Sequence, residues 1–125
     1  MATTARLGLV IFTGDKERLA QFYEAVTGLH IASQNDDITV LAAESFELVI
    51  HTLRGESVSQ AALPGRESYM KPFFPVTSLS EARKLAAAFG GQVSPASEEW
   101  AARGFRACEA IDPDGNPIQF REVAP

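Results

Sequence analysis

The chain is short, mildly acidic and ordinary in hydrophobic content. Its 125 residues, 46% of them hydrophobic, suffice for a single domain, residues 1–125, with its own core. A net charge of -5 without a basic cluster argues against a nucleic-acid partner. No apolar run approaches the roughly 20 residues that span a bilayer, and the first residues lack the parts of a secretory signal. We therefore expect a soluble, cytoplasmic protein with no membrane partner.

The hydrophobic pattern predicts one βαβββ unit that occurs twice. Module one, residues 6–53, contains a helix at 16–27 and strands at 6–12, 30–34, 37–43 and 46–53. Module two, residues 70–123, contains a helix at 79–89 and strands at 70–76, 91–94, 105–111 and 117–123. Glycines follow both helices, as expected where a helix ends and a strand begins. Residues 54–67, which are polar and rich in small residues, form the linker between the modules.

Two motifs at opposite ends of the chain carry a family resemblance. Near the C-terminus, Asp112-Pro113-Asp114-Gly115-Asn116 precedes an alternating apolar and polar run, which is typical of a hairpin. Near the N-terminus, a strand leads into Asp15, a helix with Phe22-Tyr23 and the Gly28-Leu29 turn. Together they resemble the vicinal-oxygen-chelate superfamily, which includes glyoxalase I, extradiol dioxygenases, fosfomycin-resistance enzymes and bleomycin-resistance proteins.

The resemblance implies an α+β fold in which the two modules form a curved mixed sheet around a cup. The helices would pack on the outer face of that sheet. Because side chains alternate along a strand, the phase of each strand selects those that face the cup. On the first strand we expect Leu7, Leu9 and Ile11 toward the helices, with Gly8, Val10 and Phe12 inside. On later strands we expect Phe74, Ile118 and Phe120 toward the helices, with Phe73, Pro117, Gln119 and Arg121 inside.

The superfamily's metal-binding enzymes imply ligand positions that this sequence fills with poor ligands. The first falls on Gly8, the second on Lys71, the third on Gln119, and a fourth on Leu48 or Val49. A divalent cation in such a site needs His, Glu or similar donors. We therefore expect no metal and no other cofactor. An alternative set, His51, Glu47 and Gln119, lacks a third strong ligand from another strand.

The remaining cup residues suit a medium-sized organic ligand, because apolar walls are combined with a few polar groups. Trp100, in a polar loop at the predicted rim, either stacks on a flat ligand or fills the edge of the core beneath its loop. The only cysteine, Cys108, is expected to be a buried, inert thiol. The predicted ligand-binding residues are Val10, Phe12, Val49, His51, Phe73, Trp100, Gln119 and Arg121.

Three functions are compatible with this sequence. The first is a metal-free protein of the bleomycin-resistance type that sequesters a small organic ligand, with a role in antibiotic resistance. The second is a lyase, dioxygenase or thiol transferase with displaced metal ligands, or a metal-free enzyme that uses His51, Arg121 or Cys108. The third is a protein that uses the fold only for interaction. The resemblance also implies a homodimer with a cup near or across its interface; catalytic residues are not identified.

Overall fold

The computed structural model describes residues 6–53 and 70–123, so the predicted linker at 54–67 lies outside the described residues. The first unit contains one helix and four strands, all close to their predicted positions. These elements are β1 (Leu7–Thr13), α1 (Lys16–Thr27), β2 (His30–Gln34), β3 (Ile38–Ala42) and β4 (Phe46–Thr52).

The second unit repeats this order and adds a short hairpin strand that the sequence pattern did not predict. Its elements are β5 (Phe73–Val76), α3 (Leu79–Ala88), β6 (Gln92–Val93), η1 (Ala96–Glu98), β7 (Trp100–Ala102), β8 (Phe105–Ile111) and β9 (Pro117–Val123). β5 begins three residues later than predicted, after Pro72, whose backbone has no N–H for a strand ladder.

The strands form two open sheets, which confirms the α+β fold with two βαβββ units. The first sheet has the order β1-β4-β3-β2 and the second β5-β9-β8-β6, with β7 also paired to β8. β1 runs parallel to β4 and β5 parallel to β9, while the other pairs are antiparallel. Among the described residues β1 and β5 each pair on one side only, so the curved surface expected around a cup consists of two separate sheets.

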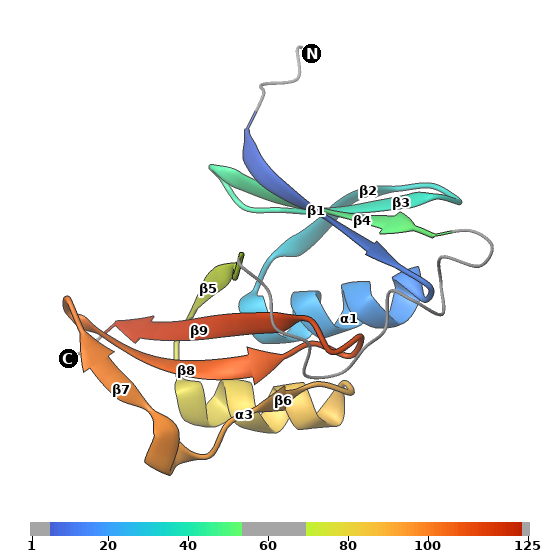
Figure 1. Cartoon of the computed structure of the whole chain (residues 1–125). Helices are drawn as coiled ribbons and strands as arrows, with labels where there is room; N and C mark the ends of the chain where they lie inside the picture. The colour runs from blue at the N-terminus through green and yellow to red at the C-terminus, as the bar shows by residue number, and fades with distance from the viewer. Residues whose placement is uncertain (1–5, 54–69, 124–125) are drawn as a thin grey trace.

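Helix α1 lies between the first sheet and α3 (Figure 1). Asp15 caps its start by accepting a hydrogen bond from the Arg18 backbone, and Gly28 follows its end with φ of 79°, a left-handed conformation that favours glycine. The apolar residues that recur at spacings of three and four along this helix, Leu19, Phe22, Tyr23 and Val26, are buried in the core. No helix among the described residues is long and apolar enough to span a membrane.

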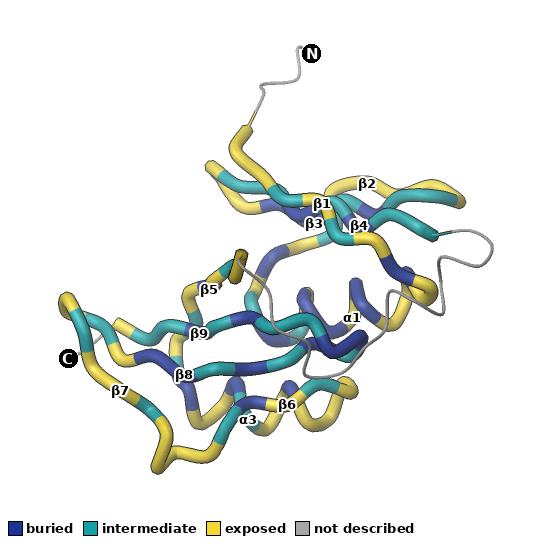
Figure 2. Tube along the Cα trace, viewed as in Figure 1, coloured by how far each residue is buried: buried dark blue, intermediate teal, exposed yellow. Residues whose placement is uncertain are grey.

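Burial alternates along the central strands (Figure 2) and confirms the predicted phase at most positions. Phe74, Ile118 and Phe120 are buried in the core, whereas Phe73 is 54% exposed. On β1, Leu9 and Ile11 pack against the core as expected. Leu7, predicted on the same side, is 79% exposed instead, because β1 extends beyond the edge of the core at this residue. The strand phase was therefore predictable, but the extent of the core was not.

The side of the first sheet that faces away from α1 also faces away from the second sheet (Figure 1). We call this side the first open face; it carries Val10 and Phe12 of β1 with Val49 and His51 of β4, because these residues alternate with core residues. The side of the second sheet opposite to Phe74 and Phe120 is called the second open face. One chain therefore presents two separate faces.

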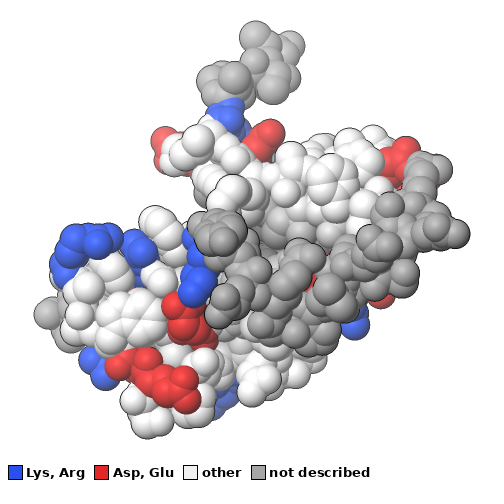
Figure 3. Space-filling model, in the orientation of Figure 1, with Lys and Arg blue, Asp and Glu red and all other residues white. Residues whose placement is uncertain are grey.

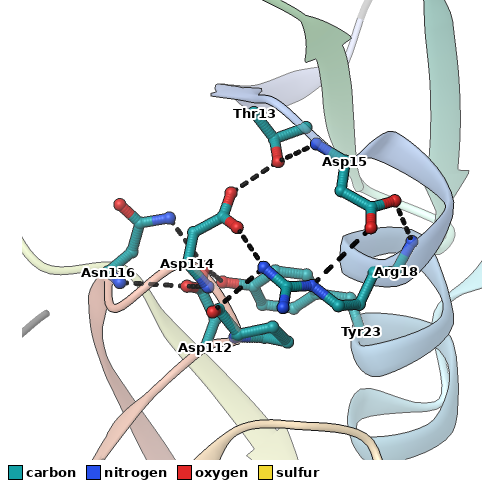
Figure 4. Close-up of polar contacts among 8 residues, drawn as sticks. Thr13, Asp15, Arg18, Tyr23, Asp112, Asp114 and Asn116 are labelled. Atoms are coloured by element: carbon teal, nitrogen blue, oxygen red, sulfur yellow. Dashed lines mark hydrogen bonds and ion pairs between the residues drawn. The ribbon is translucent and has the colours of Figure 1, made fainter. Parts of the chain in front are cut away.

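The turn between β8 and β9 binds the two units together (Figure 4). Buried Asp112 accepts a hydrogen bond of 2.7 Å from the Tyr23 hydroxyl of α1 and two more from backbone N–H groups of its own turn. Asp114 accepts from the Thr13 hydroxyl at the end of β1 and, at 3.0 Å, from Nη2 of Arg18. The aspartates of the motif thus have a structural role, since they fix the first unit to the second.

Candidate functional site

The first open face is an apolar surface with one imidazole. Phe12 is 51% exposed, and its ring centroid lies 5.2 Å from that of His51. β1 and β4 are in parallel register, which pairs Val10 with Val49 and Phe12 with His51. Nδ1 of His51 lies 2.9 Å from the Thr52 carbonyl oxygen, and Nε2 has no hydrogen-bond partner among the described residues. This face can stack against a flat ligand and offer one polar atom.

The second open face holds an arginine between two aromatic rings. The Arg121 guanidinium carbon lies 3.5 Å from the centroid of Phe73 and 4.3 Å from that of Phe105. These rings come from β5 and β8, the two strands that flank β9 in the sheet. Arg121 also donates from Nε to Oε1 of Gln119 at 2.6 Å. These contacts fix the orientation of the Arg121 side chain. Figure 3 shows that basic side chains gather over the β7–β8 end of this sheet.

Glu109 is a residue of the second open face that the sequence analysis missed. It lies opposite Gln119 in the β8–β9 register, and paired residues of neighbouring strands point to the same face. Its Oε1 accepts from Lys71 Nζ at 2.9 Å, whereas its Oε2 is buried and has no hydrogen-bond partner within residues 6–53 and 70–123. The alternation of side chains along β8 could have indicated the face of Glu109, but its position beside Gln119 follows only from the register of β8 and β9.

Trp100 lies in strand β7 and not in the loop that the sequence predicts. A two-residue turn, Arg103 and Gly104 with φ of 45° and 85°, joins β7 to β8. Positive φ at both positions is typical of a type I′ hairpin turn, which Arg-Gly does not signal as clearly as Asn-Gly. Trp100 pairs with Ala107, which pairs with Arg121, so the indole belongs to the second open face and is 37% exposed.

The structure therefore brings the eight predicted residues together as two groups. Val10, Phe12, Val49 and His51 share the first open face, while Phe73, Trp100, Gln119 and Arg121 share the second. The contacts given above between members of the eight join Phe12 to His51 on the first open face and Arg121 to Phe73 and Gln119 on the second. The predicted residues thus lie on two separate sheet faces and not around one cup.

The residues at the metal-ligand positions do not fit a divalent cation. Gly8 has no donor, and a Cβ atom placed on it would lie 2.5 Å from the Glu47 carbonyl oxygen, so the backbone leaves no space for a ligating side chain. Lys71 is a cation whose amine binds Glu109. Gln119 has its carbonyl oxygen occupied by Arg121. These donors lack the charge and availability that metal coordination requires.

The alternative set of His51, Glu47 and Gln119 does not form a cluster either. His51 and Glu47 share one face of β4, whereas Gln119 belongs to the second sheet and binds Arg121. Within the two described ranges, no group of three or more His, Cys, Asp or Glu residues is arranged to hold a metal ion. No step of chemistry is therefore assigned to a metal.

Cys108 has the environment of a structural thiol. It is fully buried in β8, and its Sγ donates to the Ser94 carbonyl oxygen at 3.3 Å. Burial raises the pKa of this thiol, and the nearby Arg83 opposes the shift only in part. Because the thiolate is the reactive form, a raised pKa and a buried sulfur both disfavour nucleophilic chemistry.

Two βαβββ units with open sheet faces are the architecture of the vicinal-oxygen-chelate superfamily. The sequence profile of the glyoxalase-like domain matches residues 8–120. The chain belongs to this glyoxalase-like family. No curated protein matches its sequence.

Solved structures agree on the fold. A glyoxalase/bleomycin resistance protein/dioxygenase family enzyme from Burkholderia phytofirmans is 20% identical, with a TM-score of 0.70 over 95% of this chain and 99% of that one. An integron cassette protein from Vibrio cholerae is 23% identical, with a TM-score of 0.64 over 98% and 97%. The fosfomycin resistance protein FosX from Mesorhizobium loti is 13% identical, with a TM-score of 0.66 over 99% and 95%. Such low identities support the architecture alone.

Proposed function

We propose that this protein binds a small organic ligand without a catalytic metal and sequesters it, in the manner of a bleomycin-resistance protein. The observation that supports this function most is the pair of open faces, each of which exposes a phenylalanine beside polar groups. Phe12 lies next to His51, and Phe73 lies against Arg121. Apolar walls with a few fixed polar atoms are typical of small-molecule sites.

We further propose a homodimer in which the first open face of one copy lies opposite the second open face of the other. Each face alone is a half-site, because ligand pockets bury most of the ligand's surface and an isolated sheet face does not. The exposed Phe12 and Phe73 would then become buried against the ligand and the partner. A two-fold arrangement creates two equivalent sites.

Trp100 provides the test of binding, because it is the only tryptophan and lies on the second open face. We expect planar organic compounds to change its fluorescence with saturation, and Phe73→Ala to weaken the response. Leu85→Ala, an exposed apolar residue of α3, is the matched control and should not change it. A broad panel of planar compounds without any saturable response would contradict the proposal.

The metal-free character needs a separate measurement. Elemental analysis of protein purified without chelator, followed by cobalt titration, should show no stoichiometric metal. Uptake of one equivalent that disappears in His51→Ala would overturn this part of the proposal and favour the alternative function, a superfamily enzyme. His51 is the residue that supports that alternative, because its Nε2 has no partner among described residues and the ring lies on an open face.

A further inference from the structure

We propose that the second open face recognises an organic anion that also carries an amino or hydroxyl group, through Arg121 and Glu109. This inference rests on the proposed small-molecule function and adds the chemistry of the ligand. Arg121 binds the anionic group, and Oε2 of Glu109 accepts a hydrogen bond from the amino or hydroxyl group.

Arg121 is oriented for this task before any ligand arrives. Phe73 and Phe105 pack against its guanidinium from the strands on either side, and Nε is occupied by Gln119. The stacked rings cover the two faces of the planar guanidinium, so the N–H groups at its edge can still donate hydrogen bonds. Among the described residues no acceptor contacts its Nη atoms, and the side chain is only half-buried. Two donors in one plane match the oxygens of a carboxylate, phosphate or phosphonate.

Glu109 supplies a hydrogen-bond acceptor for the amino or hydroxyl group of the ligand. Its Oε1 is bound by Lys71, whereas its Oε2 is buried and has no donor among the residues that the structure describes. A buried carboxylate oxygen without a hydrogen bond has lost its hydrogen bonds to water without forming others, which costs free energy. Because the Glu109 side chain as a whole is 41% exposed, a small rotation of its carboxylate brings Oε2 to the open face, where a ligand N–H or O–H would satisfy it.

The register fixes how far apart the two ligand groups are. Glu109 lies opposite Gln119, two residues from Arg121 on β9, so Glu109 and Arg121 are diagonal neighbours on one face. Such neighbours have backbone positions roughly 7–8 Å apart, and long side chains reach across this distance. The donor and the anionic group therefore belong to one small molecule or to one end of a larger one.

The overall charge of the chain favours the members of this ligand class whose amino group is protonated over those that are simple anions. A net charge of -5 repels a simple anion at long range. An amino acid-like zwitterion has no net charge, so only the local complementarity of Arg121 and Glu109 decides its binding. Trp100, on the same face, adds a flat apolar surface for an aromatic or other planar part.

Benzoate, 3-aminobenzoate, 3-hydroxybenzoate and phenylphosphonate are suitable probes, and titrations followed by proton–nitrogen NMR and Trp100 fluorescence give dissociation constants. We expect all four to perturb β8 and β9. The amino or hydroxyl compounds should bind at least about tenfold more tightly than benzoate, since a hydrogen bond to a charged group contributes that much. Comparing benzoate with phenylphosphonate distinguishes a carboxylate from a phosphorus oxyanion.

Variants assign the two roles. Arg121→Gln should abolish the response to all four probes. Glu109→Gln should reduce the preference for the amino and hydroxyl compounds over benzoate by about tenfold, and benzoate itself should bind no more weakly, because Lys71 loses its carboxylate partner. Lys84→Gln is the matched control and should leave all four responses unchanged, because Lys84 is an exposed cation of α3 and lies on neither open face. Circular dichroism and thermal unfolding confirm that each variant is folded.

Two results would overturn the inference, and they differ from failure of the proposed function. One is equal binding of benzoate and 3-aminobenzoate by the wild type; the other is a preference for 3-aminobenzoate that Glu109→Gln preserves. If other planar compounds still bind at Trp100 in either case, small-molecule binding stands and only the ligand chemistry is wrong. If no compound binds, the proposed function fails as well.

Discussion

At the scale of single residues, Gly8 shows how the backbone excludes a side chain. A Cβ atom at this position would lie 2.5 Å from the carbonyl oxygen and 3.1 Å from Cγ of Glu47 on the neighbouring strand. We expect Gly8→Ala to lower the free energy of unfolding by about 1–3 kcal/mol, since the strands must separate. Chemical denaturation measures this. Ser33→Ala, an exposed change in β2, should stay within about 0.5 kcal/mol; equal stability of Gly8→Ala and wild type would refute the steric argument.

Asp112 makes stability depend on pH in an unusual direction. Burial raises its pKa above the ordinary value of 3.8, although hydrogen bonds from Asn116 and Tyr23 oppose the shift. The folded state therefore holds this proton more tightly than the unfolded state. The stability that the proton contributes is complete below pH 3.8 and is lost as pH rises through the raised pKa.

The matching variant is Asp112→Asn, which has no charge at any pH and keeps an acceptor for the two backbone N–H groups. Relative to wild type, its free energy of unfolding should increase as pH rises from about 4 to 7. Denaturation at a series of pH values gives the difference between the two proteins. A difference that is independent of pH would show that burial does not raise this pKa.

At the scale of elements, β7 is only three residues long and depends on the residue before it. Oε2 of Glu99 accepts from Arg83 of α3 at 2.7 Å, and Oε1 accepts from Arg106 of β8 at 2.8 Å. Both arginines lower the pKa of Glu99. We expect Glu99→Gln to speed hydrogen exchange at the Trp100 and Ala102 amides by about tenfold or more, because two charge-assisted bonds are weakened.

The exposed Glu98→Gln is the control for this measurement and should leave exchange in β7 unchanged. If Glu99→Gln also leaves exchange unchanged, the hairpin turn alone holds β7 in place. The lowered pKa of Glu99 gives a second check. The contribution of this carboxylate is present above pH 4.5 and is lost as pH falls through its lowered pKa, so acid should loosen β7.

The elements also show what a sequence can predict. Helix α1 and strands β2, β8 and β9 match their predicted ranges. Asp15 and Gly28 mark the two ends of α1, and the hydrophobic periodicity marks the strands. β7 was missed, since Trp100-Ala101-Ala102 has no alternation and its turn is Arg-Gly. Glu109 was missed because its importance depends on the strand opposite it. Local patterns identify elements and their faces, whereas cross-strand partners follow from register.

At the scale of the whole molecule, Asp114 connects the two units. It accepts from Thr13 and Arg18 in the first unit while it lies in the turn of the second. We expect Asp114→Ala to cost about 2–3 kcal/mol of unfolding free energy, because it leaves the Thr13 hydroxyl and the Arg18 guanidinium without this acceptor. A double-mutant cycle with Arg18→Met measures the part that belongs to the ion pair. Additive effects of the two changes would mean that the pair does not couple the units.

The two separated open faces make the proposed dimer testable by subunit mixing. Phe12→Ala damages the first open face, and Arg121→Gln damages the second. If each site joins faces from two copies, a mixed dimer of these variants has one site with both defects and one with none. Co-refolding an equal mixture should then restore about a quarter of the binding sites, although each variant alone binds poorly. Trp100 fluorescence at saturating ligand measures the restored fraction. A site formed within one chain would restore none, since every chain in the mixture carries one defect, and this outcome would reject the shared site.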